Sequence, residues 1–399
     1  MREPGKTLEG ISFLENTHSK GKIPYPIRVG HGILQDTPDL LHQALGQKTH
    51  RDNQVLIVTD RNVAKYHLVP LAAALRKGGF KVTRIVFPAG ERLKRSTAWY
   101  RLLRAMVKHG LTRDSTVIAL GGGVIGDFAG FASSTYMRGC HLVQVPTSLL
   151  AQVDSAIGGK VGINLPEGKN LVGSFHNPLF VLIDTDTLRT LPPREFGSGL
   201  AEIVKYGLIW DHTLFQRLEG FFDTLYGEPS SVLTNTEIKS ALIQEQAFLR
   251  DIIQTSARIK AEIVRHDERE QGLRMILNFG HTFGHALEQV TGYRHFLHGE
   301  AVLLGMQMAD HLSASLGLIG DEEKIRILQL LSRFPVPRKG GLKAKRIIYS
   351  MGKDKKRRGG SLYYIVLEKI GRAVTKTDVP DSMVMDSIRR VLETNRNLS

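Results

Sequence analysis

The chain has 399 residues, with 54 Lys and Arg against 39 Asp and Glu, which gives a formal net charge of +15. A composition of 42% hydrophobic and 23% charged residues is typical of a folded globular protein and excludes a disordered or low-complexity chain. No uncharged apolar run of about 18 residues predicts a membrane span, and the first residues lack the apolar core of a secretory signal. The single cysteine, Cys140, excludes an internal disulfide and a multi-cysteine zinc site, so we expect a cytoplasmic protein.

The positive charge fits three classes of protein: a nucleic-acid binder, an enzyme that attracts small anions, or a soluble protein with a basic surface. Basic residues gather between Arg338 and Arg358, but no nucleic-acid-binding motif accompanies them. We therefore expect a small-molecule substrate, and neither a nucleic acid nor a membrane as partner.

The first part of the chain alternates strand-like and helix-like segments. Residues 1–22 are polar and aperiodic, which predicts a loose extension. Apolar runs predict strands at 55–59, 82–87, 115–120, 141–145 and 179–183, and helical periodicity predicts helices at 71–77 and 97–109. This order predicts a parallel, helix-flanked sheet over residues 23–192, a Rossmann-like α/β nucleotide-binding domain.

The pattern changes at Pro192-Pro193, where two prolines interrupt any continuous helix. Helical periodicity then predicts helices at 195–209, 236–266, 281–290, 300–316 and 322–334, with one short strand at 362–367. The fold class is therefore an α/β N-terminal domain plus a mostly α-helical C-terminal domain over residues 193–399.

Glycines follow the predicted strand at 115–120 and precede a predicted helix, in the sequence Gly121-Gly-Gly-Val-Ile-Gly-Asp127. Glycine lets the backbone approach a phosphate closely, and the amide groups of a helix start can hold a pyrophosphate. A tight turn would look the same. Two further loops after strands carry Asp60 with Asn62 and Glu91 with Lys94, and strand ends at one edge of a parallel sheet converge on ligands. Together the three loops favour a nucleotide site.

Histidines are concentrated in the second half of the chain. His281 and His285 lie four residues apart, on one face of a predicted helix, and His298 follows downstream. Imidazoles with a carboxylate are typical zinc ligands, and Glu202, one turn before Lys205, is a candidate carboxylate. The spacing indicates a metal site but does not decide which two or three of these residues bind the ion.

Basic and amide side chains next to glycines indicate an anion site, because Lys and Arg bind phosphate and carboxylate groups. A nucleotide, a metal and an anion together indicate redox chemistry on a phosphorylated polyol or sugar acid. The residues of this set are Asp154, Lys160, Lys169 and Asn170, with Arg138, Lys260, Arg274 and Lys355 adding positive charge.

At these residues the chain resembles the 3-dehydroquinate synthase family. The matching segments lie between Tyr25 and Val391 and include GGGVIGDFAGF, VPTSLLAQVDSAIGGK, GKNLVGSFHNP, LPPREF, GLAEIVKYG, LNFGHTFGHALE and LHGEA. The resemblance implies bound NAD, one divalent metal ion (zinc or cobalt), and a homodimer. It also implies conversion of 3-deoxy-D-arabino-heptulosonate 7-phosphate to 3-dehydroquinate and phosphate, by transient oxidation with NAD, phosphate elimination, re-reduction and aldol closure.

The resemblance also implies roles for individual residues. The metal ligands would be Glu202, His281 and His298. The catalytic residues would be His285, Lys160, Lys205, Asn278 and Arg274. Substrate contacts would fall on Arg138, Asp154, Lys160, Asn170, Lys205, Lys260, Arg274, Asn278, His285 and Lys355, with Arg138 reaching the partner subunit's site. NAD contacts would fall on Asp60, Asn62, Glu91, Lys94, Gly122, Gly123, Val124, Ile125, Gly126, Asp127, Thr147, Ser148, Lys160, Lys169, Thr187, Leu188, Arg189 and Thr190.

Two alternatives remain. Another sugar phosphate cyclase would share NAD and metal but differ at the positions that hold the substrate carboxylate. A metal-dependent polyol dehydrogenase of the glycerol dehydrogenase type would share the glycine loop but lack the Gly168-Lys-Asn170 and Asp354-Lys-Lys356 segments. Two positions depart from the family pattern: Leu200, where Met is common, and Tyr363, where a basic residue is common.

Overall fold

The computed structural model describes residues 12–13, 25–46, 53–226, 233–268, 270, 272–357 and 362–397. The chain divides into two compact units. Unit 1 is Met1–Leu191 with Gln246–Arg265, and unit 2 is Pro192–Glu245 with His266–Ser399. Helix α9 (Gln246–His266) thus belongs to unit 1 although the chain reaches it from unit 2.

A seven-stranded sheet forms the centre of unit 1, in the order β1-β2-β9-β6-β5-β3-β4. Only β1 pairs antiparallel, and the other six strands are parallel, as the sequence predicts. Residues 55–58 are buried on both faces of the sheet, which explains their continuous apolar run. The strands are β1 (Ser12–Phe13), β2 (Ile27–Gly30), β3 (Gln54–Asp60), β4 (Lys81–Phe87), β5 (Thr116–Gly121), β6 (His141–Pro146) and β9 (Phe180–Asp184).

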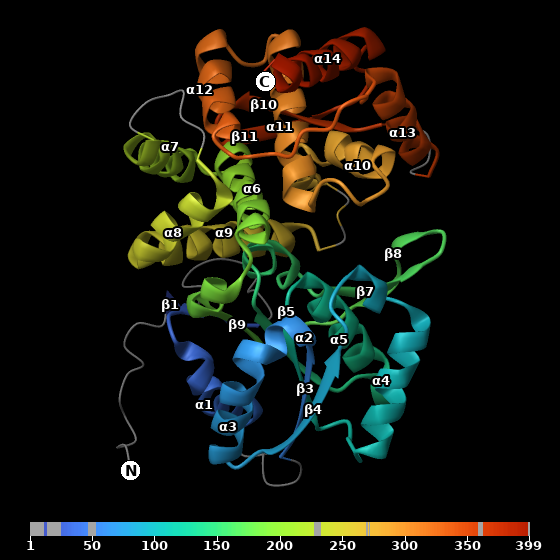
Figure 1. Cartoon of the computed structure of the whole chain (residues 1–399). Helices are drawn as coiled ribbons and strands as arrows, with labels where there is room; N and C mark the ends of the chain where they lie inside the picture. Colours follow the sequence, from blue (N-terminus) through green and yellow to red (C-terminus); the bar gives the residue numbers. More distant parts are fainter. Residues whose placement is uncertain are drawn as a thin grey trace. The chain divides into compact units, whose positions relative to one another are not determined.

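Helices cover both faces of this sheet and bury one apolar cluster against each (Figure 1). Leu41 and Leu71 belong to the cluster under α1 (Thr37–Leu45) and α3 (Val69–Lys77). Leu102 and Phe128 belong to the cluster under α4 (Ser96–Lys108) and α5 (Gly123–Thr135). A short helix, α2 (Arg61–Val63), follows β3. The glycine loop lies between β5 and α5 and so opens at the carboxyl edge of the sheet, where ligands bind in such folds.

An antiparallel hairpin that the sequence analysis did not predict follows β6. Its strands are β7 (Lys160–Leu165) and β8 (Gly168–Phe175). Their backbones approach so closely that a Cβ atom at Gly173 would lie 2.4 Å from the Val161 carbonyl oxygen. Glycine and polar residues in β8 hide the alternating pattern by which strands are recognised.

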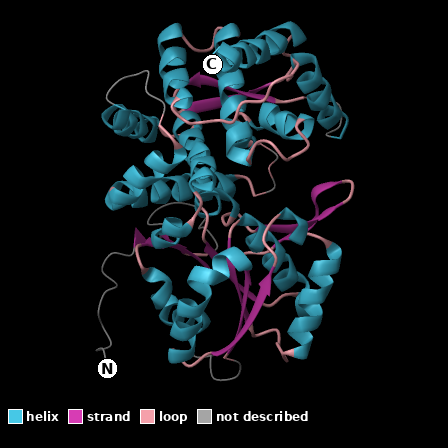
Figure 2. Ribbon diagram, in the orientation of Figure 1, coloured by secondary structure: helices cyan, strands magenta, loops and turns pink. Residues whose placement is uncertain are grey.

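Unit 2 is mostly helical, as predicted, and the strand predicted at 362–367 pairs with a further, unpredicted strand to form a small hairpin (Figure 2). Helix α6 has an almost continuous buried run from Phe196 to Ile209, so it is central to this unit. The helices are α6 (Pro193–Ile209), α7 (His212–Tyr226), α8 (Asn235–Gln244), α10 (His281–Val290), α11 (His298–Ser315), α12 (Asp321–Ser332), α13 (Ala344–Arg357) and α14 (Asp381–Asn397), and the strands are β10 (Tyr364–Lys369) and β11 (Arg372–Lys376).

The predicted strands and helices are confirmed at their positions, with one exception. The helix predicted over 236–266 is two helices, α8 and α9, because Glu245 leaves the helical region at φ −85° and ψ 59°. Apolar periodicity continues through this break, so periodicity alone does not reveal it. Of the expected N-terminal extension, the structure describes only Ser12–Phe13, as strand β1. No helix among the described residues is long and apolar enough to cross a bilayer.

Candidate functional site

Three side chains in unit 2 converge on one point. Glu202 lies in α6, His281 is the first residue of α10, and His298 is the first residue of α11. The Nε2 atoms of His281 and His298 lie 3.6 Å and 3.8 Å from Oε1 of Glu202. One ligand atom from each of the three residues lies within 4.8 Å of the other two, which is the spacing of a metal centre.

The opposite nitrogens of the two imidazoles have partners that orient the rings. His281 Nδ1 lies 3.1 Å from the carbonyl oxygen of Phe279, which can only accept, so Nδ1 carries the proton and the Nε2 lone pair is directed at Glu202. His298 Nδ1 lies 3.6 Å from Oε2 of Glu288. Metal-binding histidines commonly have such a second partner, which fixes the ring and its tautomer.

The donors at this centre fit a divalent ion. Glu202 is fully buried, and neither of its carboxylate oxygens has a well-formed hydrogen bond among the described residues, although the Lys205 ammonium contacts Oε2. A buried carboxylate is costly unless cations compensate it, and Lys205 supplies one positive charge at Oε2 while Oε1 faces the two imidazoles. Burial, and then the charge of Lys205, holds the pKa of His281 well below its usual value, so this imidazole is in the neutral form that binds metals. Two nitrogens and a carboxylate are typical of zinc and cobalt sites.

His285 lies next to this centre, one turn along α10 from His281. The two rings are 5.4 Å apart in an edge-to-face arrangement, and the rings of His285 and His298 are 5.9 Å apart. His285, Glu288 and His298 also form a group with metal-ligand spacing. The sequence analysis missed Glu288, although its spacing of three residues from His285 and seven from His281 places it on the same face of α10.

Two other predicted residues of unit 2, Arg274 and Asn278, have protein partners. Arg274 is buried and donates from Nη1 to the carbonyl oxygen of Glu268 over 2.6 Å. Asn278 donates from Nδ2 to Oε1 of Glu270 over 2.8 Å, an acidic partner that the sequence analysis did not single out. Lys355 lies in α13, but its side chain is outside the described residues.

A second cluster lies in unit 1, around Lys94. This buried ammonium donates to Oδ2 of Asp127 over 2.5 Å and also contacts Oδ1 of Asn170. Burial raises the pKa of Asp127, and the charge of Lys94 opposes that rise. Asn164 joins the cluster to Glu91, since its amide donates to Glu91 Oε1 over 2.7 Å and its Oδ1 accepts from the Asn170 backbone over 2.8 Å. Four predicted residues from three segments are thus brought together.

Neighbouring side chains lie so close to the turn of the glycine loop that a residue with a Cβ atom would crowd them. Gly122 caps the start of α5, and a Cβ atom at Gly123 would lie 2.8 Å from Oγ of Ser155. Ser148, also predicted, lies beside Gly122, at 3.2 Å from the position of a Cβ atom there. Thr147 holds the two strand ends together, donating its backbone N–H to the Gly121 carbonyl over 3.0 Å.

The remaining predicted residues of unit 1 lie in turns, in an ion pair and on the β7–β8 hairpin. Asp60 caps α2, where its Oδ1 accepts the backbone N–H of Asn62 over 2.8 Å. Asp154 pairs with Lys260 of α9 over 2.6 Å. Residues 187–190 form a short 3-10 helix in which Leu188 is buried, Arg189 donates to Asp186, and Thr190 lies 2.8 Å from His67 Nε2. Lys160 and Lys169 are exposed on the hairpin.

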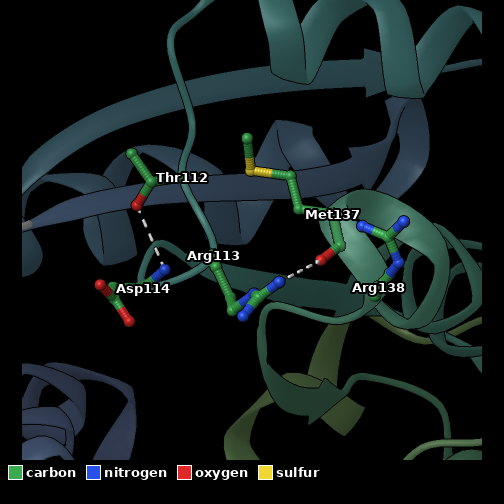
Figure 3. Close-up of a pocket in the computed structure, with 5 residues that line it drawn as sticks. All are labelled: Thr112, Arg113, Asp114, Met137 and Arg138. Carbon is green, nitrogen blue, oxygen red and sulfur yellow. Dashed lines mark hydrogen bonds between the residues drawn. The ribbon is translucent and has the colours of Figure 1, made fainter.

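Arg138 lies elsewhere in unit 1, lining an open pocket with Met137 and the turn at residues 112–114 (Figure 3). Met137 and Arg138 both have left-handed backbones, with φ of 50° and 67°. The Met137 carbonyl accepts a hydrogen bond from Arg113 Nη2 over 3.3 Å, which holds this strained turn (Figure 3).

The chain is similar in sequence to proteins of one family. The sequence model of the 3-dehydroquinate synthase N-terminal region matches residues 84–198, and that of the C-terminal region matches residues 199–357. A relative named 3-dehydroquinate synthase, from Gloeobacter violaceus, is 43% identical over 93% of this chain and 96% of its own.

Solved structures share the fold. The 2-epi-5-epi-valiolone synthase from Streptomyces hygroscopicus subsp. jinggangensis, with NAD⁺ and Zn²⁺ bound, has a TM-score of 0.78 and 28% identity, covering 95% of this chain and 99% of its own. A 2-deoxy-scyllo-inosose synthase complexed with carbaglucose-6-phosphate, NAD⁺ and Co²⁺ has a TM-score of 0.75 and 23% identity, covering 92% and 96%. Matches to both regional models and to a full-length relative lead to one conclusion: the chain belongs to the 3-dehydroquinate synthase family.

Proposed function

We propose that the protein converts 3-deoxy-D-arabino-heptulosonate 7-phosphate to 3-dehydroquinate and phosphate, with NAD and one zinc or cobalt ion. Membership of the family supports this activity. The observation that carries the proposal is the meeting of a buried carboxylate and two imidazoles from three helices of unit 2. A fold shared with NAD- and metal-bound cyclases supports the two cofactors.

Glu202, His281 and His298 would hold the ion. When bound, a divalent ion supplies Lewis-acid polarisation of the substrate hydroxyl that NAD oxidises. Lys205 is buried against Glu202, and we assign it the binding of a substrate oxygen and the balance of negative charge there. His285 lies on the open side of the same imidazole group, where it can move a proton to or from the substrate.

Unit 1 would hold NAD. The backbone of the loop from Gly122 to Asp127 offers amide groups at the start of α5 to the pyrophosphate, and the absent Cβ atoms allow its approach. Asp60, at the carboxyl end of β3, is placed to accept hydrogen bonds from ribose hydroxyls. The further NAD contacts are those that the resemblance implies, with Lys94 fixed by Asp127.

The substrate brings a phosphate and a carboxylate, which basic side chains bind by charge-assisted hydrogen bonds. We assign these contacts to Lys160, Asn170, Lys205, Lys260, Arg274 and Asn278, with Asp154 orienting Lys260 through their ion pair. We also propose a homodimer in which the strained turn at Met137 presents Arg138 to the partner subunit.

The test is phosphate release by the purified protein with NAD and Zn²⁺ or Co²⁺. We would supply the heptulosonate phosphate and sedoheptulose 7-phosphate in parallel, and repeat both assays after chelation. Chelator-sensitive release from the first substrate alone, with 3-dehydroquinate formed, is the expected result. Release only from sedoheptulose 7-phosphate would assign the protein to the sister cyclases. No release from either substrate, by protein that binds NAD and metal, would refute both cyclase activities.

A further inference from the structure

A salt bridge between the half-exposed Arg194 and the buried Glu300 joins two of the helices that carry the proposed metal centre. Arg194, in the first turn of α6, donates from Nε to Oε1 of Glu300 over 2.6 Å and from Nη2 to Oε2 over 2.8 Å. The Glu300 side chain is only 3% exposed. A bidentate pair of this kind fixes the direction as well as the distance between its partners.

The two partners of this salt bridge contact the backbone before His298, and Glu300 itself follows His298 in the sequence. Glu300 is two residues after His298, and its Oε2 also accepts the backbone N–H of Leu297 over 2.7 Å. Arg194 donates a further hydrogen bond from Nη2 to the carbonyl oxygen of His295 over 2.8 Å. The backbone that precedes and follows His298 is therefore held by one guanidinium.

A second contact from α6 holds the residue between His298 and Glu300. The backbone N–H of Gly299 donates to Oγ of Ser198 over 2.9 Å. A Cβ atom at Gly299 would lie 1.9 Å from the Ser198 carbonyl oxygen, so the two helices touch through their backbones. Arg194, Ser198 and Glu202 are spaced by four residues and form one stripe along α6.

From this arrangement we infer that the Arg194–Glu300 salt bridge is the positioning element of the metal centre, setting the distance between the Glu202 and His298 donors. The first two residues of the α6 stripe hold the start of α11, and the third supplies the carboxylate. Neither Arg194 nor Glu300 is a donor at the centre. The inference rests on the proposed metal site, because it concerns how that site is held.

The same unit offers a matched control. Arg326 of α12 forms a bidentate salt bridge with Glu219 of α7, at 3.0 Å from Nε to Oε1 and 2.7 Å from Nη2 to Oε2. It joins two helices that carry none of the three ligands. Arg326→Gln therefore removes a salt bridge of the same chemistry without touching the α6–α11 contact.

The experiment titrates Co²⁺ into the chelator-stripped full chain, recording its visible absorption and the affinity by competition with a chelating dye. We expect Arg194→Gln to lower the affinity about 10- to 100-fold and to alter the Co²⁺ spectrum. The Co²⁺ affinity of Arg194→Lys should lie between those of the parent and of Arg194→Gln, because lysine keeps the charge but not the planar guanidinium. Arg326→Gln should change affinity less than about threefold, although it too loses a salt bridge.

Because Arg194→Gln leaves the Glu300 carboxylate buried and uncompensated, the double variant Arg194→Gln, Glu300→Gln separates folding from positioning. Its thermal midpoint should recover toward that of the parent while its Co²⁺ affinity stays low. Parent-like affinity and spectrum in the folded double variant would overturn the inference. Failure of the parent chain itself to bind Co²⁺ would instead refute the proposed metal site.

Discussion

Asp310 gives the protein a pH-dependent stability that can be worked out from the structure. This residue of α11 is fully buried, and neither carboxylate oxygen has a hydrogen-bond partner among the described residues. Burial raises its pKa to about 8 from an ordinary value of 3.8, with Lys324 opposing the rise and Glu323 adding to it. In the native fold at neutral pH the side chain is therefore mostly the uncharged acid.

The direction of the pH dependence follows from the number of protons that the native and unfolded states bind. Between pH 4 and pH 8 the native state keeps a proton on Asp310 that the unfolded state has lost, so the free energy of unfolding falls as pH rises through this window. Each pH unit within the window is worth about 1.4 kcal/mol, so raising the pH from 5 to 7 removes about 2 to 3 kcal/mol. Below pH 4 both states are protonated and the effect vanishes.

Asp310→Asn removes the titrating group and keeps the shape of the side chain. The difference in unfolding free energy between this variant and the parent should therefore shift by about 2 to 3 kcal/mol in favour of the variant between pH 5 and pH 7. Urea unfolding at pH 5, 6, 7 and 8, with chelator present and NAD absent, measures this difference. The neighbouring His311 titrates in both proteins, with a pKa that burial lowers to about 4, and so cancels in the comparison.

The control is Asp39→Asn, at an exposed position in the first turn of α1. Its difference from the parent should stay within about 0.5 kcal/mol across the same pH range, as for most surface substitutions. If the Asp310→Asn difference is equally flat, Asp310 is ionised or hydrated in the native protein, and the reasoning from its burial is wrong.

Three further predictions test the metal centre, the Lys94 cluster and the helix packing. Glu202→Gln should lower metal affinity at least about 100-fold, measured as bound zinc after dialysis against a chelating dye, because it would remove the carboxylate donor of the proposed ligand set. Lys94→Met should destabilise the protein by about 2 to 4 kcal/mol by calorimetry, since the partly buried Asp127 carboxylate loses its cation, and Asp127→Asn in the same chain should restore part of the loss. Gly305→Ala should lower the thermal midpoint by several degrees. Its Cβ atom would lie 2.0 Å from the Gly280 carbonyl oxygen, so α10 and α11 must move apart. An unchanged midpoint would contradict this packing.

The parallel sheet of unit 1 could be predicted because its signals are local. Buried parallel strands are continuous apolar runs, and residues 55–58 or 117–120 show this directly. The β7–β8 hairpin could not be predicted in the same way. Its strands contain Gly162, Gly173 and Asn170, which take close or left-handed backbones in place of the usual alternation. Likewise the apolar periodicity of residues 236–266 does not reveal that α8 ends at a single residue, Glu245.

The metal centre shows the same division between local and distant information. His281 and His285 share a helix turn, so the spacing along the chain already places them together. The choice among the ligands depends on α6, about 80 residues earlier in the sequence, and only the fold brings Glu202 to His281 and His298.

The supporting residues of the centre are harder still to find from sequence, because each acts through another residue. Glu288 lies beside His298 across a helix pair, and Arg194 acts on the backbone around His298 through Glu300. In isolation each looks like an ordinary surface charge. Their importance comes from the direction of their contacts, which exist only once α6, α10 and α11 have packed. A metal centre of this kind therefore depends on two sets of residues. The candidate ligands can be predicted from sequence spacing, whereas the surrounding contacts are defined only by the packed helices.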